Sequence, residues 1–166
     1  MTELRILILV GLLLVQSGCG FHLRGTASLP YHSIFIEAPA TSVLGPLIRR
    51  AIKTRTQTQL ADNPKVADAL FTLISEQRQK VILSLSTGGR VREYQLIYRL
   101  SYRLTDKENK TLRPDTIINL HRNFSFNDQD VLSKESEEAL LYRDMQNDAV
   151  AQLMRQLEKT PDLSHE

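Results

Sequence analysis

The chain has 166 residues, and its 21 lysines and arginines almost balance 19 aspartates and glutamates, so the formal net charge at pH 7 is only +2. This balance argues against a dedicated nucleic-acid-binding protein, whose domain would be strongly positive. The length suits one domain with an ordinary hydrophobic core and leaves little room for a second.

The N-terminal stretch is an apolar run, Ile6 to Val15, which follows Arg5 and ends at small residues. This pattern is typical of a secretory signal, and the run is too short to cross a bilayer, because spanning needs about 20 apolar residues. Ser17-Gly18-Cys19 is similar to a bacterial lipobox, in which the cysteine receives a diacylglycerol and the preceding peptide is removed. The sequence therefore predicts a signal peptide over residues 1–18 and lipid attachment at Cys19.

Cys19 is the only cysteine of the chain, so it has no disulfide partner within it. The alternative is an ordinary signal or a short anchor helix in which Cys19 stays a thiol. Gln16 stands where a lipobox usually carries leucine, which predicts slow processing. Gly20 is not the aspartate that typically retains such proteins in the inner membrane, so the resemblance implies the outer membrane.

After Cys19, residues 19–30 are expected to form a lipidated tether, followed by one domain over residues 31–159 and a flexible tail over residues 160–166. Residues 33–37 form a compact apolar pattern that predicts a strand. Thr41 or Ser42 is expected to cap a helix of about four turns whose apolar residues recur at helical spacing, namely Leu44, Leu47, Ile48, Ala51 and Ile52. Its basic side is interpreted as a solvated face in preference to a lipid-headgroup surface.

Residues 69–86 and 93–104 predict a long β-hairpin, with Gly88-Gly89 as its turn. The first of these segments turns polar around Glu76 to Lys80, so it is a continuous strand or a strand with a bulge. The second strand alternates strictly, with an apolar or aromatic side chain at every even position from Tyr94 to Leu104. A two-residue turn is preferred because it places apolar pairs opposite each other: Leu83 with Tyr94, Val81 with Leu96, and Leu73 with Leu104. A three-residue turn would place Lys80 and Arg78 there instead.

The remaining chain predicts an exposed connection over residues 106–115, a fourth strand and a long helix. The strand is marked by Ile118, Leu120, Phe124 and Phe126, with Arg122 on the same face at a position that needs either a partner or a sheet edge. Ser133 is expected to cap the helix, whose apolar stripe is Leu141, Tyr142, Met145, Ala149, Leu153 and Leu157. The order β-α-β-β-β-α predicts an α+β fold, a two-layer sandwich of a four-stranded mixed sheet and two helices.

No pattern of catalytic or cofactor-binding residues stands out. The four histidines, at positions 22, 32, 121 and 165, lack metal-ligand spacing. The acidic residues Asp128, Asp130 and Asp144 fall in a turn and on a helix surface, where solvated carboxylates are common. We therefore expect neither an enzyme nor a metal or cofactor site.

Four stretches resemble the LPS-assembly lipoprotein LptE family of the Gram-negative outer membrane. They are Cys19-Gly-Phe-His-Leu-Arg-Gly25, Arg92-Glu-Tyr-Gln95, Phe124-Ser-Phe-Asn-Asp128 and Leu141-Tyr-Arg-Asp-Met-Gln-Asn-Asp-Ala149. The resemblance implies a lipid-anchored, non-enzymatic subunit that plugs the β-barrel protein LptD, helps it assemble and binds lipopolysaccharide (LPS). The alternative is a free periplasm-facing lipoprotein that carries an apolar ligand or supports envelope structure.

The hairpin tip and the turn into the last helix are the expected site of LPS contact. Four basic residues fall there, Lys80, Arg90, Arg92 and Lys134, beside the apolar Val81, Leu83 and Leu85. Arginine can hold a phosphate through two parallel hydrogen bonds and lysine adds a point charge, while the apolar patch suits acyl chains. The alternatives are a hairpin that is basic for solubility, or an apolar tip that packs on the barrel wall.

Overall fold

A computed structural model describes residues 28–160, and the expectations for residues 1–27 and 161–166, including lipid attachment at Cys19, lie outside this range. The elements follow the order β1 (Ser33–Glu37), α2 (Leu44–Arg55), β2 (Gln59–Leu60), a 3-10 turn η2 (Pro64–Val66), β3 (Ala69–Leu85), β4 (Val91–Asp106), β5 (Thr111–Ser125) and α3 (Val131–Glu158). Within this range, no helix is both long and apolar enough to cross a membrane.

The strands form one mixed sheet in the order β2-β1-β3-β4-β5. β1 pairs in parallel with β3, as the intervening helix predicts, and β3, β4 and β5 are joined antiparallel. The α+β prediction is confirmed, although the sheet has five strands and not four. The additional strand, β2, has only two residues, Gln59 and Leu60, which are too few to produce an alternating pattern.

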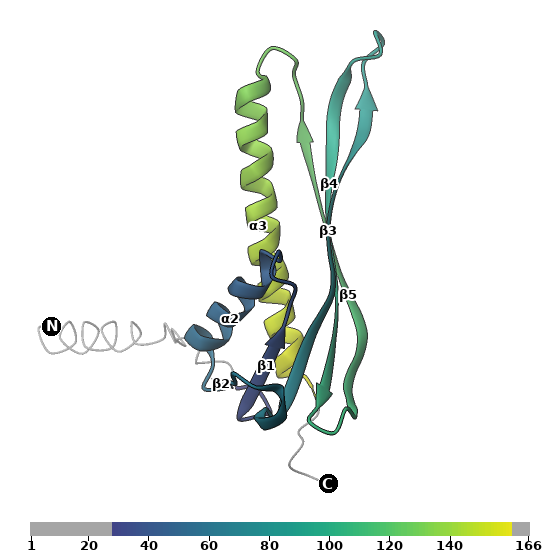
Figure 1. Ribbon diagram of the computed structural model, residues 1–166. Helices are drawn as coiled ribbons and strands as arrows, with labels where there is room; N and C mark the ends of the chain where they lie inside the picture. The colour runs from purple at the N-terminus through teal and green to yellow at the C-terminus, as the bar shows by residue number, and fades with distance from the viewer. Residues whose placement is uncertain (1–27, 161–166) are drawn as a thin grey trace, which may run out of the picture.

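Helices α2 and α3 cover one face of the sheet and leave the other face free (Figure 1). The Ser42 hydroxyl accepts hydrogen bonds from the backbone amides of Leu44 and Gly45, both at 3.1 Å, so Ser42 satisfies two N–H groups that an isolated helix leaves unpaired. The core-facing residues of α2 are Leu44, Gly45, Ile48, Ala51 and Ile52.

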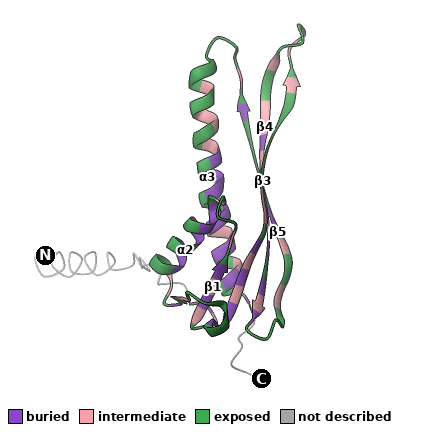
Figure 2. Cartoon of the chain, in the orientation of Figure 1, coloured by how far each residue is buried: buried purple, intermediate pink, exposed green. Residues whose placement is uncertain are grey.

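Most of the core lies in the half of the molecule that holds α2 and β1, with buried residues such as Phe124 continuing it to the end of β5, and the hairpin tip and the start of α3 extend beyond it (Figure 2). The alternation of β4 is confirmed, because Leu96, Tyr98, Leu100, Tyr102 and Leu104 are all fully buried. The predicted stripe of α3 is also core, with Leu141 partly buried and the rest buried. The long β3–β4 hairpin is therefore anchored at its base and exposed at its tip.

The predicted hairpin register is wrong. Ser86 N donates to Arg90 O at 2.8 Å, so three residues, Thr87 to Gly89, form the loop, and Gly89 takes a positive φ of 75°. As a result Lys80 pairs with Leu96 and Ile82 with Tyr94. Burial could not select the register here, because Val81, Ile82, Leu83 and Leu85 are all exposed whichever face they occupy.

A bulge at Ile74 lets the two halves of β3 keep different registers. Below it Phe71 pairs with Leu104 and Leu73 with Tyr102, and above it Glu76 pairs with Leu100. The extra residue changes which side chains face the helices, since a one-residue offset exchanges the two faces of a strand. Glu76, Arg78, Lys80 and Ile82 consequently face the same side as the core of β4.

Several boundaries also differ from expectation. β5 begins at Thr111, so the exposed connection expected over residues 106–115 shrinks to a short turn, and α3 begins at Val131 without a side-chain cap from Ser133. Leu29 and Thr160 are buried, so the folded part extends slightly beyond residues 31–159. Arg122, expected to need a partner or a sheet edge, donates from Nη2 to Asp148 on α3 at 2.6 Å.

Candidate functional site

Three aromatic rings gather where β5 ends, beside the part of the long hairpin that is nearer its tip. The Tyr94 ring stacks on Phe124 at a centroid distance of 5.7 Å and meets Phe126 edge-on at 5.2 Å. Phe126 is tied to β4 through a 2.8 Å hydrogen bond from its backbone amide to the Arg92 carbonyl. The cluster thus joins β4, β5 and the turn that enters α3.

Lys80 lies over this aromatic cluster. Its Nζ is 4.3 Å from the Tyr94 ring centroid, 5.5 Å from that of Phe124 and 5.8 Å from that of Phe126. The same Nζ forms a 2.5 Å ion pair with Glu138 of α3, and the Lys80 side chain is 33% exposed. Lys80 therefore links the sheet to the helix, instead of lying free at the hairpin tip.

Lys134 approaches the same place from the helix. Its Nζ lies 2.8 Å from Glu137 and 3.3 Å from the hydroxyl of Ser125, the residue next to Phe124, and its side chain is only 17% exposed. Lys80 and Lys134 each have an acidic neighbour, so part of their charge is already neutralised. Their cations are held in position but are less available to a new anion.

Arg90 and Arg92 occupy an open hollow beside the cluster. The hollow is lined by Leu85, Ser86, Thr87, Arg90, Val91, Arg92, Phe126, Asn127, Asp128 and Gln129. Both arginines are exposed and have no side-chain ion pair with any residue of the 28–160 range. Asp128 is the acidic residue of this lining, so the two guanidinium groups give the hollow a positive excess.

The structure brings the four predicted basic residues together around Phe124 to Phe126. Lys80 covers the rings, Lys134 bonds Ser125, and Arg90 and Arg92 share the hollow with Phe126. The apolar residues of the predicted site, Val81, Leu83 and Leu85, are 40–55% exposed on the adjoining part of β3. Val81 faces the opposite side of β3 from Lys80, whereas Leu85 lines the hollow together with both arginines. The exposed arginines and this adjoining aliphatic side chain could together bind an amphipathic anion.

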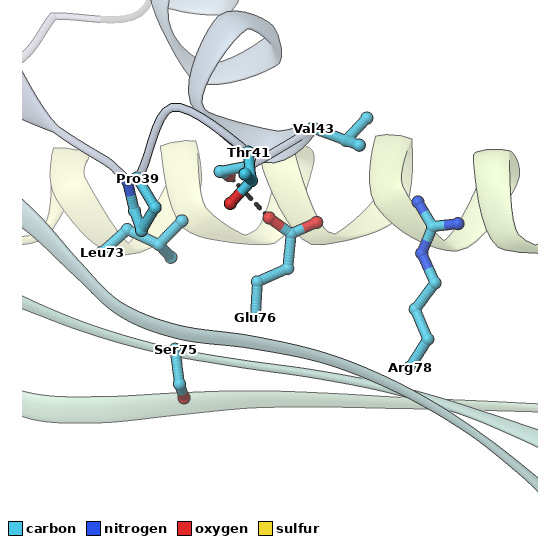
Figure 3. Close-up of a pocket in the computed structure, with 8 residues that line it drawn as sticks. Pro39, Thr41, Val43, Leu73, Ser75, Glu76 and Arg78 are labelled. Carbon is cyan, nitrogen blue, oxygen red and sulfur yellow. Dashed lines mark hydrogen bonds between the residues drawn. The ribbon is translucent and has the colours of Figure 1, made fainter.

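A second hollow lies at the start of α2, between that helix and the bulge of β3 (Figure 3). Glu76 is its central charged group, and one carboxylate oxygen accepts a 2.6 Å hydrogen bond from the Ser42 hydroxyl. The other oxygen accepts a 2.6 Å bond from the Tyr98 hydroxyl. Because Glu76 is already occupied on both oxygens, we interpret this hollow as structural.

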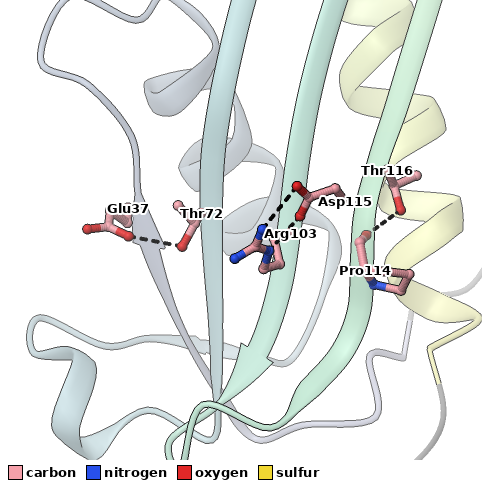
Figure 4. A network of polar contacts seen from close by, with 6 residues as sticks. All are labelled: Glu37, Thr72, Arg103, Pro114, Asp115 and Thr116. Carbon is pink, nitrogen blue, oxygen red and sulfur yellow. Dashed lines mark hydrogen bonds and ion pairs between the residues drawn. The ribbon is translucent and has the colours of Figure 1, made fainter.

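The helix-free face of the sheet is polar and held by local pairs (Figure 4). Arg103 forms two hydrogen bonds to Asp115, at 2.5 Å and 3.0 Å, and the Thr72 hydroxyl donates to Glu37 at 2.9 Å. The Arg103 guanidinium lowers the pKa of the Asp115 carboxyl from its ordinary value. These exposed pairs contribute little to stability, and they do not converge on a site.

The perturbed tyrosines reflect packing. Burial raises the pKa of Tyr98 well above its ordinary value, with a further rise from the hydrogen bond to Glu76, and burial raises the pKa of Tyr102 to about 12. Their hydroxyls bond Glu76 and Gln156 within the core layer. Among residues 28–160, no group of three or more His, Cys, Asp or Glu side chains could hold a metal ion.

Sequence reasoning misses Glu76 and the aromatic cluster. Glu76 is part of a polar stretch whose facing depends on the bulge at Ile74. The change from apolar to polar residues there allows a bulge as an alternative, but it does not give the bulge's position. Tyr94, Phe124 and Phe126 each fit an apolar strand face. Only the pairing of Tyr94 with Phe124 reveals that they meet.

Comparison with known proteins shows relatives of similar sequence and solved structures of similar fold. The family model for lipopolysaccharide-assembly, LptE, matches residues 31–157. An LPS-assembly lipoprotein LptE from Yersinia enterocolitica is 31% identical over 160 residues, covering 92% of this chain and 74% of the relative. One of the same name from Pectobacterium atrosepticum is 28% identical over 150 residues, covering 87% of this chain and 79% of the relative.

Two solved structures have similar folds. The solution structure of an uncharacterized lipoprotein B from Nitrosomonas europaea has a TM-score of 0.74 and 40% identity, covering 84% of this chain and 90% of that one. The crystal structure of the rare lipoprotein B from Shewanella oneidensis has a TM-score of 0.66 at 20% identity, covering 75% and 92%, and supports the fold alone. Since the family model spans most of the chain, this protein belongs to the LptE family of lipopolysaccharide-assembly proteins.

Proposed function

We propose that this protein is a lipoprotein of the outer membrane that plugs and helps assemble the LptD β-barrel and binds LPS on its way to the cell surface. Cys19 carries the lipid, and the folded body faces the periplasm and enters the barrel lumen. The protein acts by binding and not by catalysis. Family membership supports the role in LPS assembly, and the basic cluster around the end of β5 supports direct contact with LPS.

The proposed LPS contact rests on one observation: two of the four basic side chains have an acidic partner and two do not. Arg90 and Arg92 are exposed and without an ion pair among the described residues, whereas Lys80 and Lys134 are paired with Glu138 and Glu137. Arginine is suited to hold a phosphate through two parallel hydrogen bonds. The two arginines therefore make the primary contact with the lipid A phosphates, and the acyl chains lie over the exposed aliphatic residues of β3.

A charge-reversal series tests this contact. LPS binding is measured first for Arg90→Glu/Arg92→Glu. Lys134→Glu is added only in a second step, because Lys134 pairs with Glu137 and its reversal places two acidic side chains beside each other. Loss of two charge-assisted hydrogen bonds, at about 1.5–3 kcal/mol each, should weaken LPS binding by at least about a hundredfold in a salt-sensitive way. Arg99→Glu/Arg143→Glu is the matched control, since it changes the net charge equally at exposed positions elsewhere.

The thermal midpoints of all variants should stay close to that of the native protein. If the Arg90/Arg92 variant binds LPS as tightly as the control does, the hairpin tip is not the LPS contact.

Copurification tests whether the protein is bound to a β-barrel partner. A plug should leave detergent-solubilised outer membranes with one large β-barrel protein at about equal stoichiometry, and recovery of the lipoprotein alone would contradict the role as a plug.

A further inference from the structure

Helix α2 carries charge of a single sign. It has four basic residues, Arg49, Arg50, Lys53 and Arg55, and no acidic residue, whereas α3 has three basic and six acidic residues. The buried residues of α2, among them Ile48 and Ile52, face the core, so the basic residues lie on the solvent side.

Three of these four cations are available for a partner. Arg49 donates from Nη2 to the Ile36 carbonyl at 2.6 Å and is thereby engaged with β1. Arg50, Lys53 and Arg55 are exposed, and within residues 28–160 their side chains form no hydrogen bond or ion pair. These three residues are called the basic face below.

The basic face lies close to the point where the chain enters the fold. The Thr58 hydroxyl donates to the Tyr31 carbonyl at 3.1 Å, and Gln59 N donates to His32 O at 2.8 Å. The residues that follow α2 thus hold the first described residues of the chain. Nine peptide units separate Cys19 from residue 28, and even fully extended they span only about 30 Å.

The same end of the molecule exposes a further basic and apolar pair. Val66 in the η2 turn is 69% exposed beside the exposed Lys65, and Val66 lines one hollow together with His32 and Gln57. Of the nearby acids, Asp68 is bonded to the backbone amide and hydroxyl of Ser33, which leaves Asp62 as the exposed acid between α2 and η2. Positive charge therefore predominates at this end.

We propose that the basic face of α2 lies on the anionic phospholipid headgroups of the leaflet that holds the lipid on Cys19. This inference rests on the lipid attachment in the proposed function. The anchor keeps this end of the domain within about 30 Å of the bilayer. Within this reach the three unpaired cations can come into contact with the anionic surface, and there, inside a Debye length of about 10 Å, each contributes about fivefold to binding. The attraction fixes which side of the domain faces the membrane.

The test uses the full lipidated chain in vesicles. Because Cys19 is the only native cysteine and its thiol is consumed by the lipid, Thr54→Cys provides one free thiol in the middle of the basic face for a nitroxide spin label. Collision of the label with a nickel chelate on lipid headgroups reports contact with the surface. Vesicles of phosphatidylethanolamine and phosphatidylglycerol are compared with neutral phosphatidylcholine vesicles.

We expect strong collision at position 54 in anionic vesicles, and its loss in neutral vesicles or at about 1 M salt, where the Debye length falls to about 3 Å. Arg50→Glu/Lys53→Glu/Arg55→Glu should reduce the surface-bound population by roughly a hundredfold, from about fivefold for each residue. A label at Thr87→Cys is the control. Thr87 belongs to the hairpin loop closed by the Ser86–Arg90 hydrogen bond, and the tip of the hairpin lies far from α2 (Figure 1).

Three outcomes would overturn the inference. Suppose that the mass of the N-terminal peptide shows the acyl chains but the collision at position 54 is equal in anionic and neutral vesicles. The headgroup contact would then be contradicted, while the lipid attachment would stand. Absence of that acyl mass would overturn the lipid attachment and this inference together. If the triple reversal leaves the bilayer signal unchanged but abolishes copurification with the barrel, the basic face binds protein and not lipid.

Discussion

The Tyr98 hydroxyl of β4 donates a 2.6 Å hydrogen bond to one carboxylate oxygen of Glu76, whose other oxygen accepts a 2.6 Å bond from Ser42 at the start of α2. Leu44 N also points to this carboxylate, at 3.4 Å. Glu76 thus connects the sheet to the N-terminus of the helix, where negative charge is favourable.

Glu76→Ala should lower the free energy of unfolding by about 2–3 kcal/mol, because it removes two hydrogen bonds to a charged group and leaves the Tyr98 hydroxyl without its acceptor. Urea denaturation measures the change. Gln77→Ala is the matched control at the next, exposed position, and it should cost less than about 0.5 kcal/mol. Equal costs for the two substitutions would contradict the role of Glu76.

Alkaline pH should destabilise the protein through its buried tyrosines. Burial raises the pKa of Tyr98 well above the ordinary value of 10.0 and the pKa of Tyr102 to about 12, while the unfolded chain keeps the ordinary value. Above about pH 10 the unfolded state therefore binds fewer protons than the folded state, so the free energy of unfolding falls as pH rises towards 12.

Tyr98→Phe tests this origin of the pH dependence. It should reduce the steepness of the fall by up to about 1.4 kcal/mol per pH unit, the contribution of one proton, as measured by urea denaturation across this pH range. Tyr94→Phe serves as the control, since Tyr94 is only partly buried. An unchanged slope in Tyr98→Phe would show that other groups control alkaline unfolding.

Aspartate substitutions should separate the two faces of β4. Tyr98→Asp and Leu100→Asp place a carboxylate at fully buried positions, whereas Arg99→Asp lies on the exposed face. A buried unpaired charge should remove most of the stability of a small domain, about 5–15 kcal/mol in total, while the exposed change should stay within about 0.5 kcal/mol. If chemical denaturation ranked Arg99→Asp as the most damaging, the assignment of faces would be wrong.

The three-residue hairpin loop predicts different responses from its two glycines. Gly89 has a φ of 75° with open space where a Cβ would lie, so Gly89→Ala should cost about 1–2 kcal/mol for conformational reasons alone. Gly88 does not adopt a positive φ, and Gly88→Ala should be nearly neutral. A reversed order in thermal denaturation would favour a different turn.

Cys19→Ala should leave an unprocessed or mislocalised chain whose folded body is unaffected. The thiol is the proposed attachment point of the acyl chains, each buried methylene of which contributes about 0.8 kcal/mol of membrane affinity. Fractionation of membranes and the mass of the N-terminal peptide provide the measurement. Recovery of this variant cleaved after Gly18, and bound to membranes as firmly as the parent without a partner, would contradict the lipid attachment.

The sequence by itself determined the elements whose burial repeats with a clear period. Strict alternation from Tyr94 to Leu104 predicted a half-buried β4, and helical spacing of Met145, Ala149 and Leu153 predicted the core face of α3. These predictions hold because burial in a large, continuous core stabilises apolar side chains on one face of the element and not on the other, so the sequence shows the period. The grouping of Arg90, Arg92 and Lys134 near one end was likewise predicted from the hairpin and the final turn.

Tertiary structure alone decided the register of the hairpin and the partners of its polar residues. Beyond Lys80 the apolar side chains of β3 are exposed, so moving Val81 or Leu83 to the other face changes little burial and the sequence cannot select between two registers. The Gly89 conformation and the bulge make that selection, and they turn Glu76 and Lys80 towards the helices. Long-range contacts with Ser42 and Glu138 then stabilise an arrangement that no local pattern encodes.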